Sequence, residues 1–477
     1  MAVKINLNDL KYRYEVYQLF NVYFSMNSID FVTKDESEYE VYIDDKTLKF
    51  THKEYFKEEP IGEDVKNSLR RFIFVCLRDL TKDIYPWGIL IGIRPSKIAL
   101  KLLKEGNSED EVIEIFKEKY LAHEDKARLC IDVAKAEERI VNKDKNSIAI
   151  YIGMAFCPTR CVYCSFTANP IGTHKKMVKP YVEALIKEIN GMSEYVKEKK
   201  LNIESVYFGG GTPTSVNDEE FSLVMKEIYN NFIKDNNVKE FTVECGRPDS
   251  INRNKLQTMK EYEVNRISIN PQTMNDETLK LIGRNHTSKD IIEKFNMARE
   301  IGFEDINMDL IIGLPGEGYK EFLHTKEELI KLKPDSITIH GLALKRGSTM
   351  YENFVLKKGI EVTAQEEIIK MYEETKKLGD SLELSPYYMY RQKNMVGNME
   401  NLGYAKKGNE CIYNIQMIEE RQTIIALGAA AVSKIIFLEE DRIERFPNLK
   451  DLHEYVTRID EMIERKKELL DTLYKYN

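Results

Sequence analysis

The chain has 477 residues, of which 42% are hydrophobic and 31% are charged, and its net charge is −8. This length exceeds what one ordinary core holds, so two or three domains are expected. The mixed and mildly acidic charge gives no electrostatic basis for binding nucleic acid or a membrane surface, and no stretch approaches the roughly 20 consecutive apolar residues of a membrane span.

The first 145 residues are expected to form a separate α/β module, and no motif assigns it a role. The opening stretch MAVKINLNDLKYRY lacks the apolar segment of a secretory signal, so a cytoplasmic protein with reduced thiols is expected. The aromatic-rich residues 11–24 fit a helix or a strand, residues 40–53 alternate around a turn as a hairpin does, and residues 65–80 have helical periodicity. A polar segment at 141–147 marks the boundary.

Residues 146–380 are expected to form an open, partial (βα)6 barrel of the TIM type. Six apolar, β-branched runs occur here, and each is followed by a helical pattern, such as 179–198, with Pro180 near its start, and 218–232. Strand–helix alternation predicts βαβ units and a parallel sheet, and six units are fewer than the eight of a closed barrel. The runs are IAIYIG (148–153), SVYFGG (205–210), EFTVEC (240–245), RISIN (266–270), INMDLIIG (306–313) and SITIHG (336–341).

Residues 381–477 break this alternation and are expected to form a mostly helical extension. Residues 387–411 are rich in Tyr, Asn and Gly, which is typical of a loop, and residues 419–437 contain a patch of small residues. Residues 452–476 have the pattern of a strongly amphipathic helix. We expect that helix to cover a face of the sheet or barrel rather than to mediate oligomerisation.

Three cysteines crowd one loop. Cys157, Cys161 and Cys164 have the spacing C-x3-C-x2-C directly after the first strand, at the end of the barrel where chemistry gathers. A disulfide framework is not expected, because the seven cysteines of the chain are an odd number and the other four are scattered. A zinc site would need a fourth ligand such as His174, and three inert buried thiols would be unusual in a loop. An iron–sulfur cluster fits better, because cubanes normally take four thiolates and three leave one iron open to a small chelate.

A glycine-rich segment follows the second strand. The stretch FGGGTPT (208–214) contains Gly210, Gly211 and Thr212. Glycines allow a close approach of the backbone, and their N–H groups can face the polar head of a ligand. A plain glycine-rich turn is the alternative.

Polar side chains follow or face the next strands. Glu244 ends the third strand, and Asp309 faces one side of the fifth, where a buried carboxylate needs a partner. Gln272 lies just past the fourth strand, and Arg284 lies on the helix expected after it. These carboxylate, amide and cationic groups are candidates for binding a polar ligand at this end of the barrel. The alternatives are a structural salt bridge for Asp309 and a solvated helix face for Arg284.

The cysteine spacing, its place after the first strand and the aromatic Tyr163 before the third cysteine resemble the radical S-adenosylmethionine (SAM) superfamily. The segments YIGMAFCPTRCVYC, YFGGGTPT, VECGRPDS, ISINPQTMNDETLKLIGRNHT, INMDLIIGLPGE and ITIHGLALKRGS resemble, in order and content, the oxygen-independent coproporphyrinogen III oxidase family over about 148–437. The N-terminal module and residues 387–434 look most like the branch named coproporphyrinogen dehydrogenase HemZ.

The resemblance implies that the three cysteines hold a [4Fe–4S] cluster and that eleven further residues line the SAM site. These are Tyr151, Tyr163, Gly210, Gly211, Thr212, Glu244, Gln272, Arg284, Asp309, Ala343 and Val432. The implied reaction is the oxidative decarboxylation of two propionates of coproporphyrinogen III to vinyl groups, which gives protoporphyrinogen IX in haem biosynthesis. It implies a tetrapyrrole substrate and a small electron donor such as flavodoxin or ferredoxin. Cationic candidates for binding the propionates are Lys345, Arg346 and Arg391.

Two positions depart from the family pattern. The established oxidases have a fourth cysteine two positions after the third, where this chain has Phe166. Related haem chaperones also lack that cysteine, and they have His-Asn where this chain has Tyr413 and Asn414. Three hypotheses follow: a porphyrinogen-decarboxylating radical enzyme, a haem-binding trafficking protein that retains the cluster and SAM, and a radical enzyme acting on another substrate.

Overall fold

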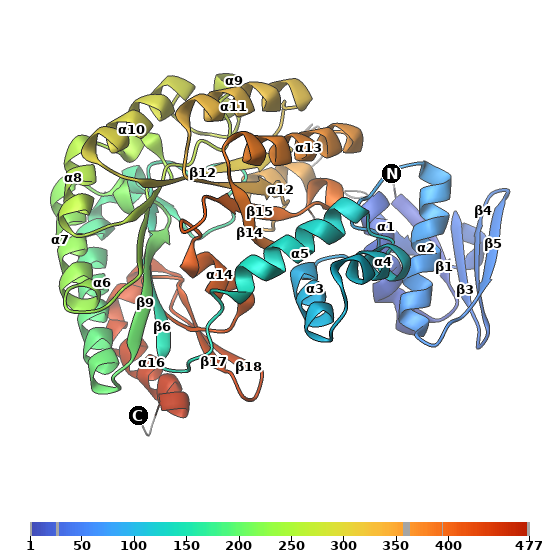
Figure 1. Ribbon diagram of the computed structural model, residues 1–477, viewed down its shortest axis with the longest axis horizontal. Helices are drawn as coiled ribbons and strands as arrows, with labels where there is room; N and C mark the ends of the chain where they lie inside the picture. The colour runs from blue at the N-terminus through green and yellow to red at the C-terminus, as the bar shows by residue number, and fades with distance from the viewer. Residues whose placement is uncertain (1, 25–27, 356–362, 394, 475–477) are drawn as a thin grey trace.

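The computed structural model describes residues 2–24, 28–355, 363–393 and 395–474. An eleven-stranded sheet curves through the larger part of the molecule, with helices around its outer side, and a five-stranded sheet forms a smaller body beside it (Figure 1). Among the helices within those ranges, none combines the length and apolarity that a membrane span requires.

The N-terminal module is the five-stranded sheet and the two helices that pack with it. The strand order is β2-β1-β3-β4-β5, in which β1 runs parallel to both neighbours and β3, β4 and β5 are antiparallel. The β3–β4 pair confirms the predicted hairpin, α2 confirms the predicted helix, and the aromatic-rich segment is helical. The elements are β1 (Ala2–Leu7), α1 (Arg13–Tyr23), β2 (Ser28–Phe31), β3 (Tyr39–Ile43), β4 (Thr47–His52), β5 (Tyr55–Pro60) and α2 (Val65–Thr81).

Three helices join this module to the barrel: α3 (Pro95–Lys104), α4 (Glu109–Tyr120) and α5 (Glu124–Glu138). Their apolar side chains belong to the same buried cluster as those of the barrel. A buried polar contact reinforces the junction, because Trp87 Nε1 and Lys126 Nζ donate to the two carboxylate oxygens of Glu400 at 2.6 and 2.7 Å. The domain boundaries expected at residues 145 and 380 stay a prediction. In the structure, α3, α4 and α5 pack with the barrel.

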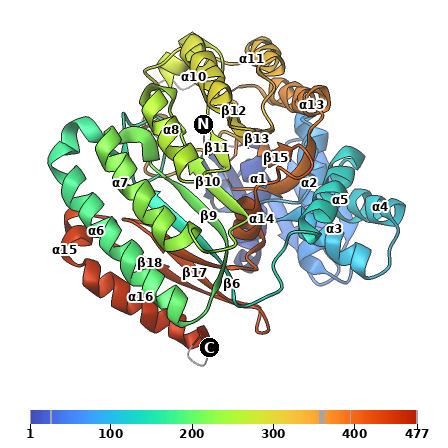
Figure 2. The same cartoon turned by 60° about the vertical axis from the view of Figure 1, so that its left-hand side comes forward.

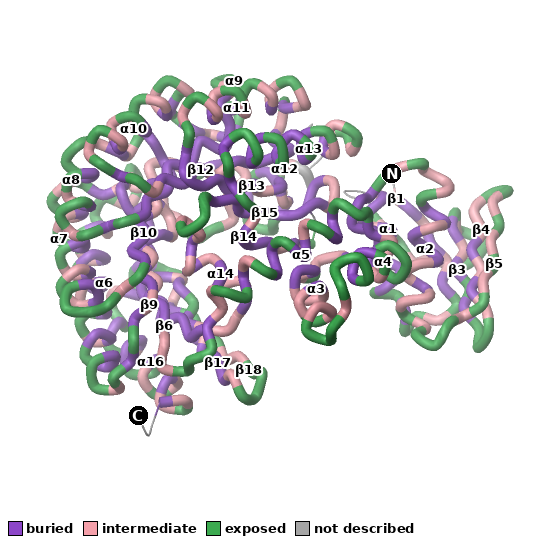
Figure 3. Tube along the Cα trace, viewed as in Figure 1, coloured by how far each residue is buried: buried purple, intermediate pink, exposed green. Residues whose placement is uncertain are grey.

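The centre of the large sheet is parallel, as the strand–helix alternation predicts. Six consecutive parallel strands lie in the order β6-β9-β10-β11-β12-β13. Helices cover their outer side, and most residues of the strands are buried (Figures 2 and 3), which explains their continuous β-branched runs. The strands are β6 (Ser147–Met154), β9 (Asn202–Gly210), β10 (Glu240–Glu244), β11 (Arg266–Ser268), β12 (Asp305–Ile312) and β13 (Ser336–Gly341).

The outer helices follow the strands in turn. The expected helix at 179–198 begins earlier, at Ile171, with an irregular backbone at His174, so Pro180 lies inside it. The expected helix at 218–232 ends at Ile228 and continues as a π-helical turn over Tyr229–Ile233. The helices are α6 (Ile171–Glu198), α7 (Asp218–Ile228), α8 (Arg253–Glu261), α9 (Asp276–Leu281), α10 (Ser288–Ile301), α11 (Tyr319–Leu332), α12 (Thr349–Val355) and α13 (Gln365–Ser381).

The C-terminal extension differs from the mostly helical segment expected, because it adds strands to both ends of the sheet. On one side β15 pairs antiparallel with β13 and then with β14; on the other, β16 is a seventh parallel strand beside β6, followed by antiparallel β17 and β18. Short helix α14 packs against β14 and β9. The elements are β14 (Ser385–Tyr390), β15 (Asn401–Ala405), α14 (Ile412–Glu419), β16 (Thr423–Leu427), β17 (Val432–Phe437), β18 (Arg442–Pro447), α15 (Leu452–Thr457) and α16 (Ile459–Tyr474).

The final amphipathic stretch forms two helices, α15 and α16, which pack against α6 and, through α16, against β17. The expectation that it covers a face of the structure is confirmed, although the stretch breaks at Arg458. Residues 475 and 476 of the predicted helix lie outside the described residues.

Candidate active site

The three clustered cysteines lie on the loop after β6. Cys157 closes the two-residue strand β7 (Phe156–Cys157), Cys161 is buried, and Cys157 and Cys164 are half-buried. Because β6 is parallel to its neighbours, this loop stands at the carboxyl rim of the barrel, where the loops after the other parallel strands also lie.

Neighbouring loops hold the cysteine loop in place. The Val162 N–H donates to the Ile282 carbonyl at 3.1 Å, and the Val162 carbonyl accepts from the Met350 N–H at 2.8 Å. Arg160 Nη2 donates to the Gly347 carbonyl at 2.6 Å. The segments that follow β11 and β13 therefore hold the cysteine loop in place through hydrogen bonds from two sides.

The thiols suit a cluster better than a single metal ion. Within the described part of the chain, no three His, Cys, Asp or Glu side chains are placed to share one metal ion. A cubane differs, because each thiolate binds a different iron. Burial raises the pKa of Cys157 to about 12 and also raises that of Cys164, so metal binding must displace protons.

The glycine-rich segment after β9 fits tightly against β6 and β7. Gly210 has a φ of +98°, and a Cβ on Gly211 would lie 2.4 Å from the Phe156 carbonyl oxygen. The N–H groups of Gly211 and Thr212 donate to the carbonyls of Met154 and Phe156 at 2.6 and 2.7 Å. The expectation that these N–H groups face a ligand is therefore wrong, because the main chain of β6–β7 uses them. The Thr212 hydroxyl instead donates to Cys157 Sγ at 3.3 Å.

Two carboxylates lie on adjacent parts of the interior. Glu244 ends β10, and its Oε2 is 2.8 Å from the place that a Cβ on Gly209 would occupy. Burial and the negative charge of Asp309 raise the pKa of Glu244 to about 8, while Arg284 lowers it. Asp309 forms no ion pair with Lys or Arg among the described residues; its Oδ1 accepts from Asn307 at 2.7 Å. Of the structural salt bridge considered for Asp309 in the sequence, there remains a contact with His340, whose Nε2 lies 3.8 Å from Asp309 Oδ2.

Gln272 and Arg284 are both buried near the ends of β11 and β12. Gln272 has a φ of +67°, exchanges main-chain hydrogen bonds with β12, and its Oε1 has no partner among the described residues. Arg284 lies between α9 and α10, not on a helix, so a solvated helix face is excluded. Its two terminal nitrogens donate to the carbonyls of Asn270, Pro271 and Gly246, and its Nε is without a described partner.

The remaining expected SAM-site residues lie at this rim or below it. Tyr163 lies in the cysteine loop, close enough to Arg284 for an electrostatic interaction, and Ala343 follows β13 and pairs with Met395 in an isolated β-bridge. Val432 begins β17 and is 41% exposed. Tyr151 lies in the middle of β6, below the loops of the rim. The roles of all eleven residues stay a prediction.

Aromatic rings fill the barrel below this rim. The rings of Tyr151, Tyr207 and Tyr413 are roughly parallel and form a triangle, with ring centres 4.5 Å apart for Tyr207 and Tyr413, 6.0 Å for Tyr151 and Tyr413, and 6.2 Å for Tyr151 and Tyr207. Tyr413 comes from α14, whose first N–H groups donate to the Glu240 carboxylate. Tyr413 is therefore a buried part of the barrel filling.

The three cationic candidates for propionate binding separate into two kinds. Lys345 and Arg346 are exposed on the loop after β13, and neither forms an ion pair with a described residue. Arg391 is buried; it donates to the carbonyls of Leu90, Asn398 and Met399, and its guanidinium lies 4.6 Å from the Trp87 ring centre. Arg391 fastens the barrel to the N-terminal half, so its assignment to propionate binding is wrong.

Several polar residues at this rim were not expected from the sequence. His340 reaches toward Asp309 from β13, and Arg247 and Asp249 lie directly after β10. The signal that could have found them is their position, because each lies at the carboxyl end of a parallel strand.

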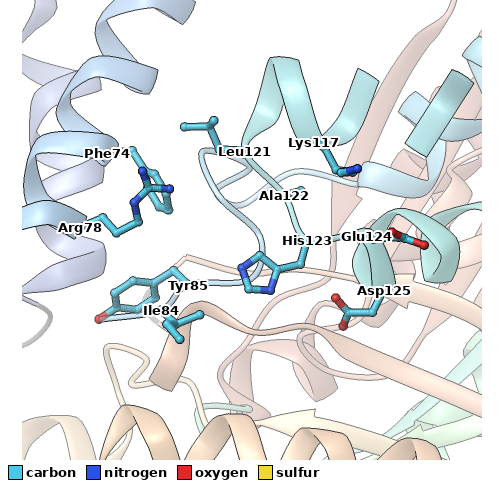
Figure 4. Close-up of a pocket in the computed structure, with 10 residues that line it drawn as sticks. All are labelled: Phe74, Arg78, Ile84, Tyr85, Lys117, Leu121, Ala122, His123, Glu124 and Asp125. Carbon is cyan, nitrogen blue, oxygen red and sulfur yellow. The ribbon is translucent and has the colours of Figure 1, made fainter. Parts of the chain in front are cut away.

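A separate cavity of about 550 Å³ lies between α2 and the start of α5 (Figure 4). Phe74, Arg78, Tyr85, Lys117 and His123 are among the side chains around it. None of the expected site residues lines this cavity, so it is not part of the rim described above.

Comparison with known proteins identifies the family. Residues 151–329 match the Radical SAM superfamily. The chain is 41% identical over 428 residues to the oxygen-independent coproporphyrinogen-III oxidase-like protein HemZ of Bacillus subtilis, covering 89% of this chain and 84% of that protein. The chain belongs to this HemZ-like family of radical SAM proteins.

Other relatives carry a different name. The heme chaperone HemW of Bacillus subtilis is 34% identical over 223 residues, which are 47% of this chain and 57% of that protein. Among solved structures, coproporphyrinogen III oxidase (HemN) from Escherichia coli, described as a radical SAM enzyme, has a TM-score of 0.52 at 22% identity and covers 71% of this chain and 73% of that one. This likeness supports the radical SAM fold.

Membership of the superfamily implies a [4Fe–4S] cluster and SAM. The residues at the carboxyl rim of the barrel fit both groups. Three thiols on one loop match a cluster with one open iron. The two inward carboxylates Glu244 and Asp309 suit a ligand that carries an ammonium and a sulfonium. The partnerless Gln272 Oε1 and Arg284 Nε are a buried acceptor and a buried donor that a ligand can satisfy.

Proposed function

We propose that this HemZ-like protein is a radical SAM oxidoreductase that converts the propionate side chains of coproporphyrinogen III into vinyl groups. The observation that carries the proposal is the 41% identity, over 89% of the chain, with a protein named coproporphyrinogen-III oxidase-like. The three thiols and the two carboxylates supply side chains that such a reaction needs.

Cys157, Cys161 and Cys164 would each hold one iron of a [4Fe–4S] cluster and leave the fourth iron for the amino-acid end of SAM. When bound, these groups would supply a 5′-deoxyadenosyl radical, formed by one-electron reductive cleavage of SAM, for removal of a hydrogen atom from a propionate β-carbon. The propionate would then lose carbon dioxide and pass one electron to a separate one-electron acceptor, leaving a vinyl group, and two such rounds would give protoporphyrinogen IX.

The chain's own residues would orient SAM and exclude water. Asp309 and Glu244 would accept hydrogen bonds from the ammonium and the ribose hydroxyls, and Gln272 Oε1 would accept another. The Arg284 Nε–H would donate to the methionyl carboxylate. The tyrosine rings below would close the interior, so that the radical meets substrate rather than solvent.

Substrate binding would use the cations at the rim. Lys345 and Arg346 are exposed beside the cysteine loop and free to pair with propionates. Reduction would come from a small one-electron donor such as flavodoxin or ferredoxin, in the cytoplasm, where the seven thiols stay reduced.

Product analysis tests the proposal directly. Reconstituted protein would be incubated without oxygen with coproporphyrinogen III, SAM and a reductant, and protoporphyrinogen IX and carbon dioxide would be measured. We expect both products from the native chain and from Cys76→Ser, whose thiol lies in the N-terminal core, and neither from Cys161→Ser. SAM cleavage without either product would point to another substrate and contradict the proposal.

A haem-binding chaperone is the second candidate, favoured by the similarity to heme chaperone HemW and by Phe166 in place of the fourth cysteine. Phe166 is 67% exposed beside the cysteine loop. The buried Tyr413 argues against a haem ligand at that position. Retention of haem after anaerobic purification, without decarboxylation, would support this candidate.

A further inference from the structure

A buried arginine points at one of the cluster cysteines. Arg247 follows β10 by three residues and is 3% exposed. Its Nη1 lies 3.5 Å from Cys161 Sγ, within hydrogen-bond distance for sulfur, and 3.0 Å from Thr159 Oγ1. The guanidinium therefore meets the cysteine loop at a ligand atom and at the residue two positions before it.

Asp249 fixes the direction of this guanidinium. Arg247 donates from Nε and Nη2 to the two carboxylate oxygens of Asp249 at 2.9 and 2.8 Å. Burial acts to raise the pKa of Asp249, but His286 and Arg247 hold it below its usual value, so the carboxylate stays ionised. This pair of hydrogen bonds to Asp249 uses one edge of the planar guanidinium, so Nη1 stays directed at Cys161 Sγ.

Two of the three cysteines accept from different side-chain donors. Cys157 accepts from the neutral Thr212 hydroxyl at 3.3 Å, whereas Cys161 accepts from the positively charged Arg247 guanidinium at 3.5 Å. Hydrogen bonds to cluster sulfurs and nearby positive charge favour the reduced, more negative state, and a buried location strengthens the effect.

We infer that Arg247 is a positioning residue that raises the reduction potential of the cluster held by Cys157, Cys161 and Cys164, with Asp249 aiming its guanidinium. The inference rests on the cluster-binding part of the proposed function. A higher potential eases electron entry from a weak one-electron donor, which is the step that must precede SAM cleavage.

The test is a redox titration of the reconstituted full-length protein, followed by the EPR signal of the reduced cluster. Arg247→Met and Arg247→Gln both remove the charge, and Arg247→Gln keeps an N–H donor. We expect a more negative midpoint potential in both, with the larger shift in Arg247→Met. The matched control is Arg253→Met, because Arg253 is an exposed arginine on α8 that pairs with Glu300, and its potential should equal that of the native chain.

The outcomes separate the inference from the proposed function. If the native chain took up no iron and sulfide, the proposed function would fail. If the native chain assembled its cluster and either Arg247 variant with a cluster titrated at the native potential, the inference alone would be overturned. If Arg247→Met does not retain its cluster, the midpoint potential of Arg247→Gln decides: a more negative value than in the native chain supports the inference, and an equal value overturns it. A purely structural arginine would change cluster yield and thermal stability but not the midpoint.

Discussion

Asp309 Oδ2 lies 3.8 Å from His340 Nε2, and the other ring nitrogen of His340 lies 3.3 Å from the Tyr390 hydroxyl. Burial acts to raise the pKa of Asp309, yet His340 and the hydrogen bond from Asn307 bring it below its usual value. The carboxylate therefore stays ionised inside the barrel. An ionised acceptor is what the ammonium or ribose hydroxyls of SAM require.

Replacing His340 by Phe should weaken SAM binding. The ring keeps much of the volume, but Asp309 loses the partner that orients and stabilises its charge. We expect the dissociation constant of SAM to rise about tenfold, equivalent to roughly 1.4 kcal/mol. Equilibrium dialysis of anaerobically reconstituted protein measures it, with the exposed His324→Phe on α11 as the control. Equal affinity in His340→Phe and the native chain would show that Asp309 does not depend on His340.

Glu244 should make the SAM-free protein less stable as the pH rises. Its folded pKa of about 8 lies above its unfolded value of 4.5, so the folded state binds the extra proton between these values. Stability from this group is complete below pH 4.5 and is lost as the pH rises toward 8. We expect the free energy of unfolding in urea to be about 3 kcal/mol lower at pH 8.5 than at pH 5.5, a difference that Glu244→Gln should reduce. An identical pH dependence in the two proteins would contradict the assigned pKa.

Gly211→Ala should damage the site through sterics. Its Cβ would lie 2.4 Å from the Phe156 carbonyl oxygen and would push the glycine segment away from the cysteine loop. We expect a loss of about 2–3 kcal/mol in unfolding free energy and reduced cluster uptake, measured by urea unfolding and by iron content. Gly172→Ala is the control: nothing lies within 4 Å of its Cβ on helix α6, so it should be neutral or slightly stabilising. Equal iron content in both variants would contradict the argument.

The parallel half of the fold could be predicted because its signals are local. The runs from Ile148 to Gly341 are β-branched and recur with helices between them, and the cysteines follow the first run. Asp309 faces inward by the two-residue period alone. Such patterns survive in a single sequence because each strand must be buried on both faces.

The C-terminal strands could not be predicted in the same way. β15 joins the sheet antiparallel to β13 and carries β14 with it, and β16 adds to the other side beside β6, so the pairing of β15 and β16 depends on partners more than 60 residues away in the chain. Arg391 shows the same limit at one side chain: a cation in a loop-like stretch suggests a surface, whereas its carbonyl partners come from Leu90 and from 398–399. The use of the Gly211 N–H by Met154 is likewise visible only when β6 and β9 are side by side.

A buried ion pair should hold the β16–β17 turn, and with it Val432, at the rim. Lys466 Nζ and Glu188 Oε1 are 2.5 Å apart with no exposed surface on either side chain, and Glu188 Oε2 also accepts from the Gly428 N–H at 2.7 Å. Lys466→Met leaves the Glu188 charge unpaired in the interior, so we expect a loss of about 3–5 kcal/mol in unfolding free energy. Lys467→Met, which removes the neighbouring, partly exposed lysine, should cost less than about 0.5 kcal/mol.

The double variant Glu188→Gln with Lys466→Met should recover part of the loss, because no charge then remains unpaired. If the double variant were as unstable as Lys466→Met alone, the cost would come from packing and not from the charge.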